Sequence, residues 1–276
     1  MTGIIYATLV VAIVGIIIGV ALVIANKIFA VATDERVAEV REALPGNNCG
    51  ACGFAGCDAM AAAIAAGEVP TNACPVCNAE RVAKISEIMG TSAGDVEKKV
   101  AFVKCSGSCD VTSARCNYVG IDDCRSAVLS GISVPNCSYG CLGYGSCVKA
   151  CAFGAIKVVN GVALVDPEKC TGCGGCAKAC PKSLIELVPY DNQLAVRCSN
   201  RDRGPAVKKV CTAGCIGCRL CTKQCPNGAI TVTDNIAHIN YVTCQNCGKC
   251  AEKCPQKVIT WMHGQPVVLD SGEEAV

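Results

Sequence analysis

The chain has 276 residues, 27 of them cysteines, and a formal net charge of +2 with those cysteines counted as neutral thiols. So high a cysteine content is typical of short secreted disulfide scaffolds, but this chain is long, its cysteine number is odd, and its cysteines fall in tight groups that suit metal centres. With only His238 and His263 as histidines and no basic stripe, haem and mixed-ligand zinc sites have little place and nucleic acid is not expected as a partner.

An uncharged apolar run occupies residues 3–25. It is long enough to cross a bilayer as one helix, and no positive residues precede it as they would in a signal peptide. The alternative, a cleaved signal peptide, would use the small residues 30–32 as its cleavage site. We expect residues 1–30 to be a membrane anchor. The remainder is expected on the cytoplasmic side, because Lys27 follows the run and many reduced thiols suit that compartment.

A small helical domain is expected over residues 31–95. Thr33-Asp34-Glu35 is typical of a helix start and Pro45-Gly46 of its end, and further helices are predicted over residues 55–66 and 79–89. Four cysteines with glycines between them suit a loop that wraps a [4Fe–4S] cube: Cys49, Cys52, Cys57 and Cys74. Cys77 is a competing fourth ligand, and a structural zinc site is the alternative.

Three later cysteine runs repeat the plan Cys-x2-Cys-x2-Cys-x3-Cys-Pro, the bacterial ferredoxin run for a [4Fe–4S] cube. They are Cys170, Cys173, Cys176 and Cys180; Cys215, Cys218, Cys221 and Cys225; and Cys244, Cys247, Cys250 and Cys254. A looser copy, with a wider first loop, consists of Cys137, Cys141, Cys147 and Cys151. An array of zinc ribbons is the alternative, but these use paired Cys-x2-Cys knuckles.

The runs pair into two ferredoxin-like modules, expected over residues 96–190 and 191–276, because Cys151 and Cys170 are as far apart as Cys225 and Cys244. Both intervals contain short apolar runs that predict a β-hairpin, over residues 155–165 and 229–239. The fold class is therefore expected to be α+β.

In such modules the fourth cysteine of each run binds the cube of the other run. The expected ligand sets of the first module are Cys137, Cys141, Cys147 and Cys180, and Cys151, Cys170, Cys173 and Cys176. Those of the second module are Cys215, Cys218, Cys221 and Cys254, and Cys225, Cys244, Cys247 and Cys250.

Six cysteines stand outside these groups: Cys105, Cys109, Cys116, Cys124, Cys198 and Cys211. The sequence Phe-Val-Lys-Cys-Ser-Gly at residues 102–107 is echoed by Ala-Val-Arg-Cys-Ser-Asn at residues 195–200. We hypothesise a sixth cluster between the modules, beyond the five expected, with ligands Cys105, Cys124, Cys198 and Cys211. The alternative is that these cysteines are small buried apolar side chains.

The order of these parts resembles the B subunit of the Rnf complex, the ion-translocating ferredoxin:NAD⁺ oxidoreductase of bacterial and some archaeal membranes. The resemblance covers nearly the whole chain and rests on the N-terminal span, the cysteine group from Cys49 to Cys74-Pro75, and the ferredoxin-like runs. It implies that the chain takes electrons from reduced ferredoxin. NAD⁺ would be reduced on a separate flavin-bearing subunit, and Na⁺ or H⁺ would cross through integral membrane subunits. The widened spacing from Cys137 to Cys147 departs from the pattern.

The chain itself carries no dinucleotide fingerprint, phosphate loop or catalytic triad, so no catalytic residue and no hydride chemistry are expected on it. Two other functions compete: a polyferredoxin-like subunit of a hydrogenase or of a formate- or carbon monoxide-oxidising complex, and a membrane-tethered zinc module. A basic face is expected to dock an acidic ferredoxin, unless it is merely a solvated surface. It comprises Lys208, Lys209, Arg219 and Lys223.

Overall fold

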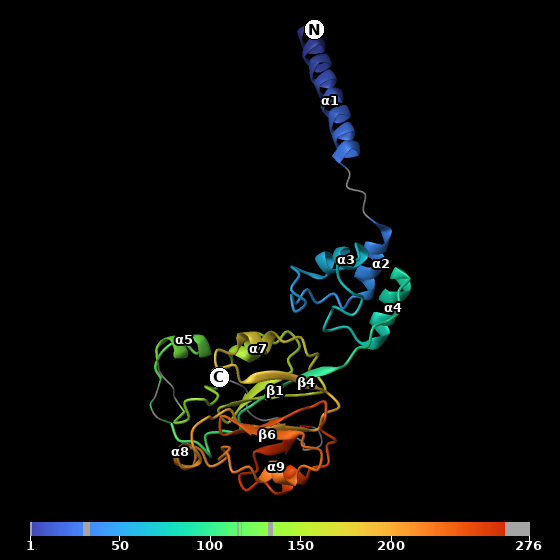
Figure 1. Cartoon of the computed structure of the whole chain (residues 1–276). Helices are drawn as coiled ribbons and strands as arrows, with labels where there is room; N and C mark the ends of the chain where they lie inside the picture. The colour runs from blue at the N-terminus through green and yellow to red at the C-terminus, as the bar shows by residue number, and fades with distance from the viewer. Residues whose placement is uncertain (1, 30–33, 115, 117, 132–134, 263–276) are drawn as a thin grey trace.

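The computed structural model describes residues 2–29, 34–114, 116, 118–131 and 135–262. The predicted helix start at Thr33, the alternative cleavage site at residues 30–32 and the end of the second predicted module lie outside the described residues. Figure 1 shows a long N-terminal helix, a small helical unit after it, and a larger cysteine-rich body built from short strands.

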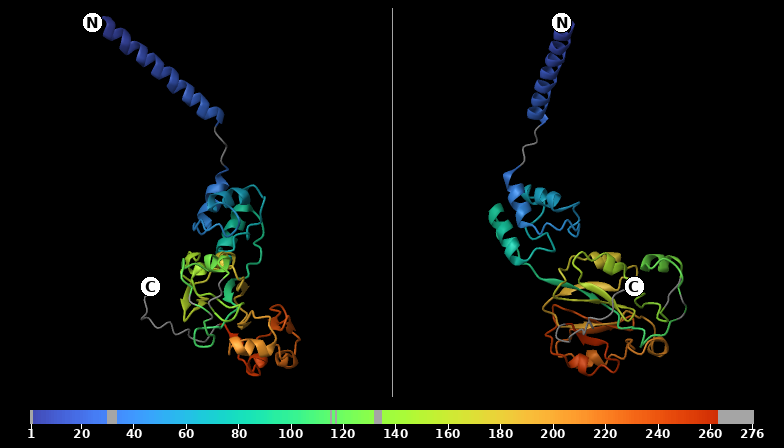
Figure 2. Two further views of the ribbon diagram at one scale, coloured as in Figure 1. Left: turned by 90° about the vertical axis from the view of Figure 1, so that its left-hand side faces the viewer. Right: turned by 180° about the vertical axis from the view of Figure 1, so that it is seen from behind.

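Helix α1 spans Thr2–Phe29 and projects away from the rest of the chain in both views of Figure 2. Its described large apolar side chains, such as Tyr6 and Val11, are exposed. Among the described residues, no helix has both the length and the hydropathy needed to cross a membrane. The membrane span predicted over residues 3–25 is therefore not supported by the described part of the chain.

Three helices form the small unit between α1 and the strands: α2 (Glu35–Ala43), α3 (Cys57–Ala65) and α4 (Ala79–Met89). The Asp34 side chain caps α2 by accepting from the Arg36 amide, and the Asn78 side chain caps α4 by accepting from the Arg81 amide. These helices lie close to the ranges that the capping residues predict. Their apolar faces meet in a core that includes Val40, Met60, Ile64, Val82 and Ile85.

The cysteine-rich body contains two copies of one antiparallel arrangement, each an outer strand pair and an inner hairpin. In the first copy, β1 (Lys99–Val103) pairs with β4 (Ile185–Pro189), and β2 (Ile156–Val159) pairs with β3 (Val162–Val165). In the second copy, β5 (Leu194–Val196) pairs with β8 (Ile259–Trp261), and β6 (Ile230–Thr233) pairs with β7 (Ile236–Ile239). The two inner hairpins lie where the sequence predicts them. We call these copies the first and second modules.

Short helices follow the cysteine loops of each module. In the first module these are α5 (Cys124–Leu129), α6 (Ser146–Lys149) and α7 (Gly175–Ala179). In the second they are α8 (Gly204–Val210), α9 (Leu220–Gln224) and α10 (Lys249–Glu252).

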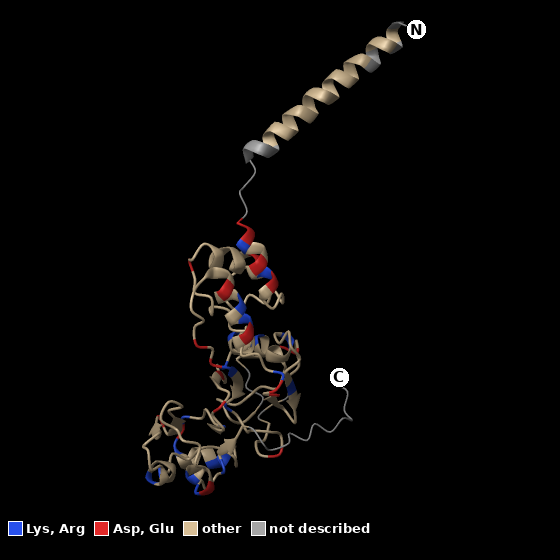
Figure 3. Ribbon diagram, turned by 90° about the vertical axis from the view of Figure 1, so that its right-hand side faces the viewer, with Lys and Arg blue, Asp and Glu red and all other residues tan. Residues whose placement is uncertain are grey.

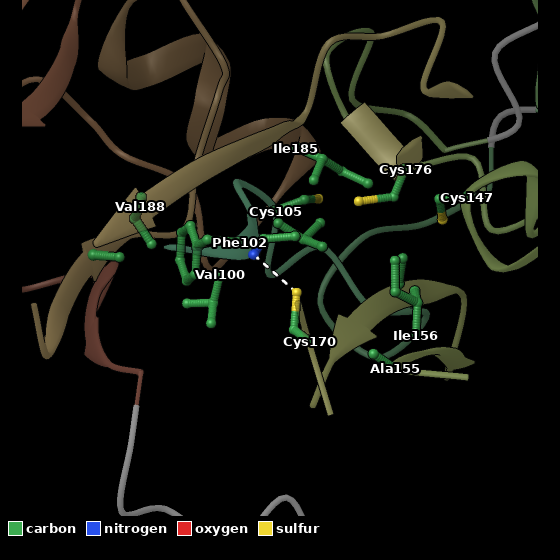
Figure 4. Packing of buried hydrophobic residues seen from close by; sticks show 14 of the residues in the cluster. Val100, Phe102, Cys105, Cys147, Ala155, Ile156, Cys170, Cys176, Ile185 and Val188 are labelled. Carbon is green, nitrogen blue, oxygen red and sulfur yellow. Dashed lines mark hydrogen bonds between the residues drawn. The ribbon is translucent and has the colours of Figure 1, made fainter. Parts of the chain in front are cut away.

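Cysteines form part of each module's core. Figure 4 shows Cys147, Cys170 and Cys176 among apolar side chains of the first module such as Val100 and Ile156. The backbone N–H of Ala101 donates to Cys170 Sγ over 3.3 Å, drawn there as a dashed line. Because the core is assembled around thiols, the stability of each module depends on what those thiols bind.

The two modules are joined through residues that follow β1 and β5. Ser199 Oγ donates to the Lys104 carbonyl over 3.0 Å, and Thr112 Oγ1 donates to the Val210 carbonyl over 2.9 Å. The guanidinium of Arg197 lies 5.3 Å from the centre of the Phe102 ring. These contacts hold the segments that carry the two echoed cysteines against one another.

Candidate iron–sulfur sites

Cysteines line four cavities of similar size, with about 340, 370, 380 and 410 Å³ of atom-free space. All described cysteines are free thiols. No three His, Cys, Asp or Glu side chains of the described residues converge closely enough to hold a single metal ion. Four thiols spread around one space fit a [4Fe–4S] cube, whose sulfur ligands also accept backbone N–H bonds.

The first cavity lies in the small helical unit and is lined by Cys49, Cys52, Cys57 and Cys74. Asn48 Oδ1 accepts from the Cys57 amide over 2.8 Å and fixes the loop at the start of α3. The competing cysteine, Cys77, is buried but does not line this cavity. A hydrogen bond from its thiol lowers the pKa of Cys74 to about 6, so Cys74 is the readier thiolate of the two.

The second cavity belongs to the second module and is lined by Cys215, Cys218, Cys221 and Cys254. Three of these cysteines come from one run and the fourth from the other, which is the crossed pattern expected from the sequence. Gly217 bends the loop with a φ of 65°. A Cβ there would lie 3.1 Å from the Asn235 carbonyl oxygen, so the loop lies close against the β6–β7 hairpin.

The third cavity, in the first module, is lined by Cys124, Cys141, Cys147 and Cys180. Cys137, which the spacing assigns to this site, does not line it, and Cys124 lies there instead. The reason is visible when the modules are compared: Cys141 and Cys147 correspond to Cys215 and Cys221, but Tyr144 stands where the second module has Cys218. Cys124 supplies the missing thiol from a longer loop.

Two residues hold Cys124 over this cavity. Asp123 caps α5, accepting from the amides of Arg125 and Ser126 through Oδ1. Its other carboxylate oxygen accepts from Ser146 Oγ over 2.7 Å, and Ser146 Oγ in turn accepts from the Cys124 amide over 2.8 Å. The hydrogen bond from Ser146, first among several contacts, lowers the pKa of Asp123. The first turn of α5 is thereby attached to α6, which carries Cys147.

The remaining ferredoxin-type groups are recognised by neighbouring thiols. Burial, and then the charges of Cys170, Cys173 and Cys151, raise the pKa of Cys176 to about 11. Burial and the charges of Cys225 and Cys244 raise the pKa of Cys250. Cys247 is exposed on the loop between Cys244 and Cys250. The amides of Ala155 and Ala229 donate to Cys151 Sγ and Cys225 Sγ over 3.4 and 3.2 Å.

The fourth cavity lies between the modules and is lined by Cys105, Cys137, Cys198 and Cys211. Three of these belong to the set predicted for a sixth cluster, but Cys137 takes the place of Cys124. The two cysteines therefore exchange sites relative to the sequence-based assignment. A signal for this exchange was present, since the spacing Cys137-x3-Cys141 repeats as Cys211-x3-Cys215. Neither Cys109 nor Cys116 lines any of the four cavities.

Burial keeps several of these thiols protonated in the absence of metal. It raises the pKa of Cys105, Cys198 and Cys221 to about 11 and that of Cys147 to about 12. Iron binds thiolates, so assembly of clusters at these sites releases protons.

Family models match three parts of the chain. The family described as "Putative Fe-S cluster" matches residues 44–76, the "4Fe-4S binding domain" matches residues 163–186, and the "4Fe-4S dicluster domain" matches residues 214–258. Each match covers one of the cysteine groups whose geometry is described above. The chain is therefore an iron–sulfur protein of the ferredoxin type, with several [4Fe–4S] clusters.

Curated relatives narrow this class, and each of the three named here is the B subunit of its complex. The chain is 47% identical to that of the Na⁺-translocating ferredoxin:NAD⁺ oxidoreductase complex of Acetobacterium woodii, over 84% of the chain and 70% of the relative. It is 43% identical to that of the proton-translocating complex of Clostridium ljungdahlii, over 88% and 87%. It is 41% identical to that of the ion-translocating oxidoreductase complex of Methanosarcina acetivorans, over 89% and 93%.

The chain belongs to the family of B subunits of these Rnf-type, ion-translocating oxidoreductase complexes. Its resemblance to that family, expected from the order of the cysteine groups, is confirmed. The competing assignments, a polyferredoxin of another redox complex and a zinc module, receive no support from these relatives.

Proposed function

We propose that the chain takes electrons from reduced ferredoxin and relays them to a flavin- and NAD-binding subunit of an ion-translocating oxidoreductase complex. The observation that carries this proposal is the series of separate cysteine-lined sites, which extends from the helical unit through both modules. Each bound [4Fe–4S] cluster would supply one-electron transfer, and the chain has no sequence motif for hydride chemistry.

Five ligand sets follow from the cavities and neighbouring thiols. The helical unit supplies Cys49, Cys52, Cys57 and Cys74. The first module supplies Cys124, Cys141, Cys147 and Cys180, and also Cys151, Cys170, Cys173 and Cys176. The second module supplies Cys215, Cys218, Cys221 and Cys254, and also Cys225, Cys244, Cys247 and Cys250. Backbone amides that donate to the sulfurs help to set the potential at each site.

The experiment that tests this function mixes the anaerobically purified full chain with chemically reduced ferredoxin and follows cluster absorbance. We expect rapid bleaching of the chain's clusters as electrons arrive. A chain with a full complement of iron that stays oxidised while ferredoxin stays reduced would contradict the proposal.

We propose further that ferredoxin docks on the second module. Lys208 and Lys209 on α8, Arg219 at the start of α9, and Lys223 within α9 are all exposed. Figure 3 shows basic segments at the end of the chain that lies farthest from α1. Cys218, next to Arg219, is also exposed, so one proposed cluster ligand reaches the surface among these charges. An acidic partner would be steered to that point.

Charge reversal tests the docking face. The variant Arg219→Glu/Lys223→Glu should slow electron transfer from ferredoxin by on the order of tenfold at low ionic strength, and less in high salt. The matched control is Lys157→Glu/Lys178→Glu, which reverses two exposed charges of the first module. Equal rates for the two double variants would place the docking site elsewhere.

We also propose that α1 attaches the chain to the cell membrane as a single-pass anchor, with the cysteine-rich part in the cytoplasm. The support is the uncharged sequence of residues 3–25 and the exposure of its described large apolar side chains, together with Lys27 just after that run. Deletion of residues 2–29 should release the chain from membranes. If the intact chain is already extracted by alkaline carbonate, α1 does not span the bilayer.

A further inference from the structure

The cavity between the modules is built equally from both. Cys105 and Cys137 come from the first module, and Cys198 and Cys211 from the second. Cys105 follows β1 and Cys198 follows β5, at corresponding positions of the two outer strands. Their near neighbours complete the match, since Cys137 and Cys211 each precede the first cysteine of a ferredoxin-type loop by four residues. The cavity therefore has approximate twofold equivalence across the junction.

Hydrogen-bond donors surround these sulfurs in the same paired way. Cys105 Sγ accepts from the amides of Gly107 and Cys141 over 3.3 and 3.5 Å. Cys198 Sγ accepts from the amides of Asn200 and Cys215 over 3.4 and 3.3 Å. Several N–H donors on one sulfur suit a thiolate ligand far better than a neutral thiol packed as a small apolar group.

The other two sulfurs also face this space. The buried Asn200 donates from Nδ2 to Cys137 Sγ over 3.4 Å. A Cβ on Gly107 would lie 3.4 Å from Cys105 Sγ and 3.9 Å from Cys211 Sγ, which places sulfurs of the two modules around one glycine. All four thiols are thus oriented toward the junction.

A buried positive charge lies beside the thiols. Lys104 and Arg197, the residues before the two echoed cysteines, both line the cavity. Arg197 Nε is buried and has no hydrogen-bond partner among the described residues. Burial lowers the pKa of Arg197, which indicates a charge that lacks compensation. A four-iron cluster with four thiolate ligands is an anion and would provide that compensation.

We infer that Cys105, Cys137, Cys198 and Cys211 hold a further [4Fe–4S] cluster at the junction of the two modules. The bound cluster lies next to one cube site of each module, because the amides of Cys141 and Cys215 contact its ligands. Its role as the link by which electrons pass between the modules rests on the proposed function. Its existence does not.

The test compares Cys198→Ser with Cys109→Ser in the anaerobically purified full chain, by iron, acid-labile sulfide and zinc content and by electron paramagnetic resonance. The parent and Cys109→Ser should contain about 24 iron atoms per chain, and Cys198→Ser about 20, with one resonance lost. A parent with about 20 iron atoms and no change in Cys198→Ser would overturn the inference. So would one zinc atom that disappears in Cys198→Ser.

A milder variant covers the case in which Cys198→Ser fails to fold. Asn200→Asp keeps the shape and the acceptor that binds the Asp202 amide, but it removes the Nδ2 donor to Cys137. It should lower the reduction potential of one cluster and leave the iron content unchanged, and unchanged potentials for every cluster would count against the site. Because these readouts do not use ferredoxin, a six-cluster chain that fails to oxidise ferredoxin would refute only the proposed function, and a five-cluster chain that oxidises it would refute only this inference.

Discussion

The two modules share their strands and differ in how they complete one cube site. The second module draws three thiols from one compact loop, at Cys215, Cys218 and Cys221. The first has Tyr144 in place of the middle cysteine and brings Cys124 from a separate helix. A ligand site can therefore be kept while its spacing motif is lost, provided that another segment is attached firmly enough to deliver the missing thiol.

The displaced position has its own packing role. The Tyr144 ring lies 5.3 Å from that of Tyr118, centre to centre, and both pack against the small cluster of Cys124, Ala127 and Leu142. Tyr144 thus helps to seat the segment whose cysteine replaces it. The second module, with Cys218 at the equivalent place, leaves that cysteine exposed.

Removal of the delivered thiol should have the largest effect. Cys124→Ser is expected to cost the first module between one and four of its iron atoms, as Cys218→Ser does in the second. Cys109→Ser, outside all four cavities, is the control and should keep full iron. Full iron and unchanged resonance spectra in Cys124→Ser would show that Cys124 is not a ligand.

A second substitution sharpens the comparison by making the first loop resemble the second. Tyr144→Cys in the Cys124→Ser background restores the regular spacing and should recover most of the lost iron. Tyr144→Ser in the same background is the matched control, because it removes the ring without adding a thiol. Equal iron in the two double variants would mean that the loops of the modules are not equivalent.

The smallest effect is expected at the hydrogen bonds that attach α5. Ser146→Ala removes the link between Asp123 and the Cys124 amide, a loss of about 1 kcal/mol that corresponds to roughly fivefold faster loss of that cube to a chelator. In the second module the equivalent residue is the exposed Leu220, which makes no such link. Leu220→Ser should therefore leave the rate unchanged, and equal rates in both variants would contradict the role given to Ser146.

Local patterns in the sequence predict the helices of the N-terminal unit and both inner hairpins, because caps and alternating apolar residues act over a few positions. The outer pairs β1–β4 and β5–β8 join segments far apart in the chain, and no local pattern specifies them. The same limit explains the exchange of Cys124 and Cys137. Spacing assigns ligands within a loop, but a thiol delivered by tertiary packing has no fixed distance from its partners.

The junction site also bears on how the protein matures. Since two of its thiols lie in each half of the chain, it is complete only after Cys211 has been synthesised and both modules have docked. The cubes within a module require only their own half. Cluster insertion is therefore expected to finish at the junction, and a chain arrested before that point would carry a pair of reactive cysteines on an open surface.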